Sequence, residues 1–128
     1  MDKVVHFEIP FDDEKRVQNF YKNLFGWKIN AVPGMPYFMV NTVATDKKNM
    51  PKEVGAINGG MMKRNVPGEG PVIVINVSDI DSYLKKVEKA GGKTVLPKQK
   101  VADMGLYARV TDTEGNVVGL WQDLSKRK

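Results

Sequence analysis

The stretch Val4-Val5-His6-Phe7-Glu8-Ile9 opens a pattern of residues that returns from Val72 onward. The second stretch reads Val72-Ile73-Val74-Ile75-Asn76-Val77, and both are apolar-rich runs of the kind that form strands. Asp13 follows His6 by seven residues, and Asp79 follows Val72 by the same number. An aspartate at this place, Asp12 or Asp13 in the first copy, accepts a hydrogen bond from a free backbone N–H and so predicts the start of a helix. The chain is therefore predicted to contain two copies of one unit, and only the first copy carries a histidine.

Apolar side chains recur in both predicted helices at positions i, i+3, i+4 and i+7, which places them on one face. They are Val17, Phe20, Tyr21 and Leu24 in the first copy, and Ile80, Tyr83, Leu84 and Val87 in the second. We expect both faces to be buried, with Phe20, Tyr21 and Leu24 in the core. Gly26 and the pair Gly91-Gly92 are predicted to end the helices, because glycine readily adopts the left-handed turn found there.

Three further strands are predicted after each helix, which gives the order βαβββ twice. In the first copy, a strand over 3–9 stops at Pro10, and strands over 27–30, 37–40 and 54–63 follow the helix. In the second copy, a strand over 72–77 precedes the helix, and strands over 93–96, 106–110 and 117–122 follow it. We predict one α+β domain, with module 1 over about 1–64, a Pro- and Gly-rich linker over about 65–71 and module 2 over about 72–124.

The composition excludes several classes of protein. The chain has 128 residues, enough for one domain with a core, and it has no cysteine for disulfides, thiolate metal sites or a nucleophile. No apolar run is long enough for a transmembrane helix, and the first residues do not resemble a signal peptide. The net charge of +5 is spread along the sequence rather than clustered. We therefore expect a cytoplasmic protein that binds neither nucleic acid nor a membrane.

Three segments resemble the vicinal-oxygen-chelate superfamily, which includes glyoxalases, bleomycin-resistance proteins and extradiol dioxygenases. These segments are His6-Phe7-Glu8-Ile9-Pro10, Phe20-Tyr21-Lys22-Asn23-Leu24-Phe25-Gly26-Trp27 and Asp112-Thr113-Glu114-Gly115-Asn116-Val117-Val118-Gly119-Leu120-Trp121. The resemblance covers almost the whole chain. It implies paired βαβββ modules that form a curved, cup-like mixed sheet facing a ligand. It also implies a homodimer, because a partner usually completes the cup in single-chain members of this superfamily.

Metal-dependent members of the superfamily hold a divalent ion through side chains on the first and last strands of each module. The resemblance maps these positions to His6, to Val72 and to Gly119, and the matching strand of the first module reads Asn58-Gly59-Gly60-Met61. Glu8 shares a strand face with His6, since alternate residues of a strand point the same way. Two groups still fall short of the three or four nitrogen or oxygen ligands that such a metal needs. We therefore expect neither a metal nor a cofactor.

The expected cup has the aromatic walls and few polar groups that are typical of a small-molecule pocket. Trp121 shares a strand face with Gly119, beside the place that a metal would otherwise take. The candidate ligand-binding residues are His6, Glu8, Tyr37, Met39, Tyr107 and Trp121. Each of these side chains has an alternative role in packing. For His6 the alternatives are a general base or ligand anchor in the cup, and a buried histidine bonded to Glu8 or to a backbone carbonyl.

Two functions remain open at this point. The first is a metal-free protein of the bleomycin-resistance type that binds a small organic molecule. The second is a metal-dependent enzyme of the glyoxalase or dioxygenase type, with His6 and Glu8 as candidate catalytic residues and further metal ligands that the sequence does not reveal. The missing ligands at Val72 and Gly119 favour the first function over an enzyme.

Overall fold

The structure is a computed structural model that describes residues 1–125 and divides into two compact units. The N-terminal unit spans His6–Pro71. The C-terminal unit combines Met1–Val5 with the chain from Val72 onward. The first residues of the chain thus pack with the second sequence copy, where the backbone N–H of Asn76 donates to the carbonyl of Lys3.

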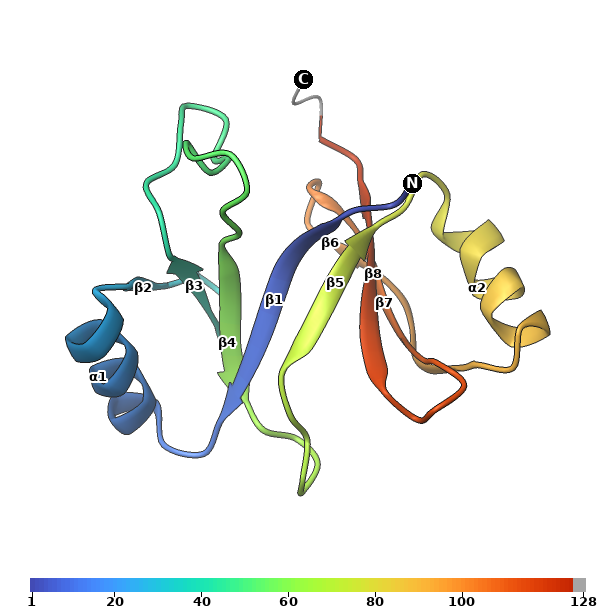
Figure 1. Ribbon diagram of the computed structural model, residues 1–128, viewed down its shortest axis with the longest axis horizontal. Coiled ribbons are helices and arrows are strands. Elements are labelled where there is room, and N and C mark those ends of the chain that lie inside the picture. Colours follow the sequence, from blue (N-terminus) through green and yellow to red (C-terminus); the bar gives the residue numbers. More distant parts are fainter. Residues whose placement is uncertain (126–128) are drawn as a thin grey trace. The chain divides into compact units, whose positions relative to one another are not determined.

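The first sequence copy folds in the order βαβββ (Figure 1). Its elements are β1 (Val4–Phe11), α1 (Glu14–Phe25), β2 (Lys28–Ala31), β3 (Tyr37–Asn41) and β4 (Gly59–Lys63). The strands lie in the order β2-β3-β4-β1, with β1 parallel to β4 and the other neighbours antiparallel. Strand β4 therefore separates β3 from β1, and a side chain of β3 has to cross β4 to reach β1.

The second copy repeats this order and topology. Its elements are β5 (Val72–Asn76), α2 (Ile80–Lys89), β6 (Lys93–Val101), β7 (Gly105–Thr111) and β8 (Val117–Asp123). The strands lie in the order β5-β8-β7-β6, with β5 parallel to β8 and the other neighbours antiparallel. The predicted α+β class, the mixed strand directions and the paired βαβββ modules are confirmed.

Both helices begin at predicted aspartates, and of Asp12 and Asp13 it is Asp13 that caps the first helix. The Asp13 carboxylate accepts a hydrogen bond from the backbone N–H of Arg16 at 2.9 Å, and Asp79 accepts one from Ser82 at 3.5 Å. Gly26 follows α1 in the left-handed conformation, with a φ of 70°. The local sequence signals therefore predict both helix starts and the end of the first helix.

Helix α2 packs its apolar face into a core, as its sequence pattern predicts. Ile80 is fully buried among Val77, Ala108, Val110 and Leu120. The remaining members of the stripe are partly buried against this cluster, namely Tyr83, Leu84 and Val87. The N-terminal unit has its own core of Phe11, Ile29, Val40 and Met61.

The prediction that Phe20 and Leu24 are core residues is wrong. Their exposed fractions are 53% and 62%, and α1 has no fully buried residue. Of the predicted stripe, only Val17 and Tyr21 pack against the core cluster. Phe20 instead packs edge-on against the Tyr21 ring, at 5.1 Å between centroids. Periodicity gives the direction of an apolar face, but it does not say how much of that face the sheet covers.

Three strand boundaries differ from the predictions by more than one residue. Strand β1 continues through Pro10, which pairs with Met62, because a proline is tolerated where the ladder does not need its N–H. The strand predicted over 54–63 starts only at Gly59, and Gly55 lies before it in a turn with a φ of 87°, which an extended strand does not adopt. Strand β6 runs to Val101, beyond the predicted 93–96, with register irregularities around Leu96 that accommodate a bulged edge strand.

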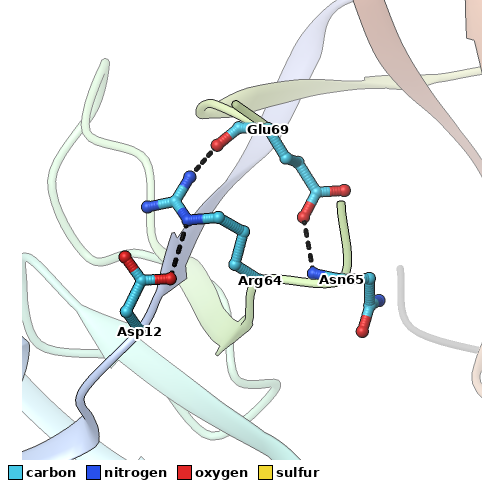
Figure 2. A network of polar contacts seen from close by, with 4 residues as sticks. All are labelled: Asp12, Arg64, Asn65 and Glu69. Atoms are coloured by element: carbon cyan, nitrogen blue, oxygen red, sulfur yellow. Dashed lines mark hydrogen bonds and ion pairs between the residues drawn. The ribbon is translucent and has the colours of Figure 1, made fainter. Parts of the chain in front are cut away.

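Hydrogen bonds within the segment after β4 hold it in a turn (Figure 2). The Arg64 side chain donates to Asp12 at 3.0 Å and to the backbone carbonyl of Glu69. The backbone N–H of Asn65 donates to the Glu69 carboxylate at 3.3 Å. Arg64 thus ties the loop to the end of β1 within the N-terminal unit.

Across residues 1–125, no helix combines the length and apolar character that crossing a membrane requires. The expected cytoplasmic location stays a prediction.

Candidate functional site

The strand registers show that Gly60 in the N-terminal unit and Gly119 in the C-terminal unit occupy equivalent positions. In the N-terminal unit, Gly60 on β4 pairs with Glu8 on β1 and with Met39 on β3. In the C-terminal unit, the matching residues are Gly119, Val74 and Arg109. Each unit also has a tyrosine two residues before the β3 or β7 member of this set, at Tyr37 and Tyr107.

Tyr37 can cross β4 because Gly60 has no side chain. A Cβ atom at Gly60 would overlap the hydroxyl and ring carbons of Tyr37, so the ring lies directly over this glycine. Neighbouring strands are about 4.8 Å apart, and a phenol that crosses one strand therefore reaches the next. The Tyr37 hydroxyl meets two side chains of β1 there.

His6, Tyr37 and Glu8 form a hydrogen-bonded chain. His6 Nε2 lies 2.8 Å from the Tyr37 oxygen, and the Tyr37 hydroxyl donates to Glu8 Oε2 at 3.2 Å. Glu8 is buried, with 6% of its surface exposed, whereas His6 and Tyr37 are partly buried. The side-chain partner of His6 is thus Tyr37, and not Glu8 as one of the sequence alternatives has it.

Burial lowers the pKa of His6 below its ordinary value of 6.5, because desolvation penalises the charged imidazolium. The negative charge of Glu8 acts in the opposite direction and offsets part of this effect. The neutral ring is therefore favoured at neutral pH. A neutral imidazole has one donor nitrogen and one acceptor nitrogen.

The C-terminal unit repeats the tyrosine–glycine arrangement without the acidic and imidazole partners. A Cβ atom at Gly119 would lie 3.0 Å from the Tyr107 hydroxyl oxygen. Strand β5 carries Val72 and Val74 where β1 carries His6 and Glu8. The Tyr107 hydroxyl instead accepts a hydrogen bond from Arg109 Nε at 2.7 Å.

Trp121 lies beside Tyr107 on the same sheet face. The two residues pair across β7 and β8, and a Cβ atom at Gly105 would overlap the Trp121 ring. Gly105 is buried, so the indole covers it as the phenols cover Gly60 and Gly119. This face of the C-terminal unit is therefore aromatic.

The six candidate residues fall into two groups. His6, Glu8, Tyr37 and Met39 lie in the N-terminal unit, and Tyr107 and Trp121 lie in the C-terminal unit. Met39 is 39% exposed, so its thioether side chain is accessible beside the glycine that Tyr37 covers. That all six residues line one cup stays a prediction.

The residues present do not fit the divalent ion that the family resemblance implies. The Tyr37 hydroxyl fills the space in which a side chain at Gly60 would begin, and His6 Nε2 is bonded to that hydroxyl. No group of three or more His, Cys, Asp or Glu side chains suited to a metal occurs within residues 1–125. A hard or borderline divalent ion in this class of site needs at least three such ligands.

The sequence made Tyr37 a candidate ligand-binding residue but did not reveal its contact with His6 and Glu8. It also missed the role of Gly60 in making that contact possible. The available signal was a glycine on one predicted strand and a tyrosine on the strand before it in the sequence. Using it requires the strand order and the register, which a single sequence does not specify at this precision.

Comparison with known proteins gives one match to the N-terminal part of this chain and several matches to most of its length. Residues 3–42 match the family model described as bleomycin resistance protein-like N-terminal. The protein named "Putative glyoxylase CFP32" from Mycobacterium bovis is 33% identical over 119 residues, which is 90% of this chain and 43% of that protein. This chain therefore spans less than half the length of that relative. A "Glyoxylase-like domain-containing protein" from Didymella fabae is 30% identical over 115 residues, 85% of this chain and 84% of that protein.

Solved structures show the same fold at lower identity. A glyoxalase/bleomycin resistance protein/dioxygenase superfamily member from Vibrio splendidus 12B01 has a TM-score of 0.63 at 16% identity, over 96% of this chain and 99% of that one. Methylmalonyl-CoA epimerase from Mycobacterium tuberculosis has a TM-score of 0.61 at 13% identity, over 96% and 89%. These structures support the fold and do not transfer a function, since one fold hosts many. With the fold, the family model and a relative matched over 84% of its length in agreement, the chain belongs to the vicinal oxygen chelate superfamily of glyoxalases, bleomycin-resistance proteins and dioxygenases.

Proposed function

We propose that this chain binds a small organic molecule without a metal ion, as a protein of the bleomycin-resistance type. The observation that carries the proposal is the Tyr37 ring over Gly60. A side chain of the protein takes the space of a metal ligand there and also occupies His6 Nε2. The same arrangement at Gly119 removes a second ligand position in the C-terminal unit.

The side chains around these glycines support the binding of an organic ligand. Trp121 and Tyr107 offer flat apolar surface in one unit, and Met39 and Tyr37 offer it in the other. His6 and Glu8 add a small number of polar atoms. Apolar walls with few polar groups are typical of sites for small organic molecules.

A ligand screen read by tryptophan fluorescence tests the proposal. The chain has two tryptophans, and Trp27 stacks on Tyr21 at 4.7 Å between centroids, so Trp27→Phe isolates the signal of Trp121. Removing an indole that a ligand covers well loses about 1–3 kcal/mol of binding free energy. Trp121→Ala should therefore lower the affinity for such a ligand roughly 5- to 150-fold.

Met39→Ala is the companion variant for the face of the N-terminal unit. A ligand whose affinity falls in either variant supports binding at the corresponding face. If a ligand is found whose affinity neither substitution changes, the assignment to these two faces is wrong.

A metal-dependent enzyme of the glyoxalase or dioxygenase type is the second candidate. It is favoured by the names of two sequence relatives, a putative glyoxylase and a glyoxylase-like domain-containing protein. It requires metal ligands beyond those that the described residues provide. An activity on a glyoxalase-type substrate that disappears on chelation and returns with a divalent ion would favour this candidate over the first.

The homodimer also stays a proposal. Sheet edges that lack a partner strand are a liability, and two-fold dimers are the commonest oligomers. Sedimentation at micromolar protein concentration should therefore give the mass of two chains, and a monomer would contradict this part of the proposal.

A further inference from the structure

We infer that Glu8 and Tyr37 fix His6 in the form that carries its proton on Nε2, so that Nδ1 accepts a hydrogen bond from a ligand with an O–H or N–H group, such as a phenol. This inference rests on the proposed function, because it specifies the chemistry of the ligand at the same site. It concerns the N-terminal unit alone.

The direction of the hydrogen bonds follows from the number of protons available. The Tyr37 hydroxyl has one proton, and it donates this proton to the Glu8 carboxylate. The Tyr37 oxygen can then only accept from its other neighbour, so His6 Nε2 has to be the donor at 2.8 Å. In a neutral ring with its proton on Nε2, Nδ1 carries a lone pair and accepts hydrogen bonds.

Nδ1 is also within reach of a ligand. The structure shows no hydrogen bond from this atom to any group within residues 1–125. Over the same residues, Asn58 Nδ2 is the single fully buried side-chain nitrogen or oxygen that lacks a partner. His6 Nδ1 therefore retains exposed surface, although the histidine as a whole is partly buried.

The surroundings of His6 favour a flat ligand that carries a hydrogen-bond donor. The imidazole lies nearly parallel to the Tyr37 ring, at 6.5 Å between centroids and 15° between planes. A partly buried acceptor beside aromatic rings forms a stronger hydrogen bond than the same group in water. A phenolic or heteroaromatic ligand matches this combination through its ring and its O–H or N–H group.

Nitrogen NMR on the ¹⁵N-labelled protein tests the first half of the inference directly. The chain has one histidine, so its two ring nitrogens are assigned without ambiguity. At neutral pH we expect Nε2 to have the chemical shift of a protonated nitrogen and Nδ1 that of an unprotonated one. Tyr37→Phe should populate both forms of the ring, because it removes the acceptor for Nε2–H.

Tyr21→Phe is the matched control, since it removes a tyrosine hydroxyl on α1 away from this chain of bonds. It should leave the ring form of His6 unchanged. A wild-type protein with its proton mainly on Nδ1, or an unchanged ring form in Tyr37→Phe, would overturn the inference.

A pair of probes tests the second half. 2-Naphthol and 2-methoxynaphthalene have the same ring system, but the methyl ether lacks the hydrogen-bond donor. We expect 2-naphthol to shift the His6 Nδ1 resonance and to bind roughly fivefold more tightly than the ether, as one hydrogen bond of ordinary strength would give. Tyr37→Phe should reduce this preference, whereas Tyr21→Phe should not.

The outcomes separate this inference from the proposed function. Equal affinity for the two probes would overturn the inference while leaving metal-free binding in place. No response of His6 to either probe at millimolar concentration would also overturn the choice of ligand class. A stoichiometric metal on His6 would instead remove the proposed function itself.

Discussion

At the scale of single residues, Gly60 determines whether Tyr37 can reach His6 and Glu8. Gly60→Ala places a methyl group in the volume of the Tyr37 ring, and the ring has to move or the backbone has to shift. Overpacking of this kind costs about 1–3 kcal/mol of the free energy of unfolding. Urea denaturation should show this loss, together with a changed NMR signal of His6.

Gly70→Ala is the matched control for that substitution. Gly70 has open space around its Cβ position and no positive φ, so the change in unfolding free energy should stay within about 0.5 kcal/mol. If the two alanine variants were equally stable, the Tyr37 ring would not lie over Gly60.

The lowered pKa of His6 implies that the stability of the fold changes with pH. Burial holds its pKa in the folded protein below the value of 6.5 expected in the unfolded chain. As the pH falls through that value, the unfolded chain takes up a proton before the folded protein does, so the free energy of unfolding decreases. The loss stops once the pH is below the folded pKa as well.

Denaturation at about pH 7.5 and about pH 5.5 measures this dependence. His6→Gln keeps a polar side chain but cannot take up the proton, so the difference between the two conditions should be smaller in the variant. An equal or larger difference in His6→Gln would show that other groups account for the pH dependence.

At the scale of elements, the two helices should respond differently to truncation although their sequence patterns match. Ile80 on α2 is fully buried, and Ile80→Ala should cost about 2–5 kcal/mol of unfolding free energy. Leu24 on α1 is 62% exposed, and Leu24→Ala should cost less than about 1 kcal/mol. Comparable losses in urea denaturation would show that α1 buries its apolar face in solution.

The elements also show what the sequence could predict. Asp13, Asp79 and Gly26 mark helix ends through local hydrogen bonds and backbone preference, so their signals survive without tertiary context. The exposure of Phe20 and the start of β4 at Gly59 depend on how neighbouring segments pack, which the local pattern does not contain. The continuation of β1 through Pro10 could not be predicted either, because whether a strand accepts a proline depends on its partner strand.

At the scale of the whole molecule, the sequence repeat predicts the paired modules, which the structure confirms. The absence of a metal, which we expect from the missing ligand residues, stays a prediction. The hydrogen-bonded chain of His6, Tyr37 and Glu8 was not predictable, because it joins two strands across a third. A one-residue shift of β4 that brought Met61 to the place of Gly60 would put a methionine side chain where the Tyr37 ring lies, and the contact would be lost. The chemistry of this site therefore depends on a register that only the structure supplies.

Elemental analysis of the purified protein tests the central claim, that Tyr37 and not a metal ion is the partner of His6. After dialysis against zinc, nickel, manganese or iron salts and removal of unbound ions, the account predicts far less than one metal ion per chain and no difference between wild type and His6→Ala. About one ion per chain in the wild type, lost in His6→Ala, would contradict it.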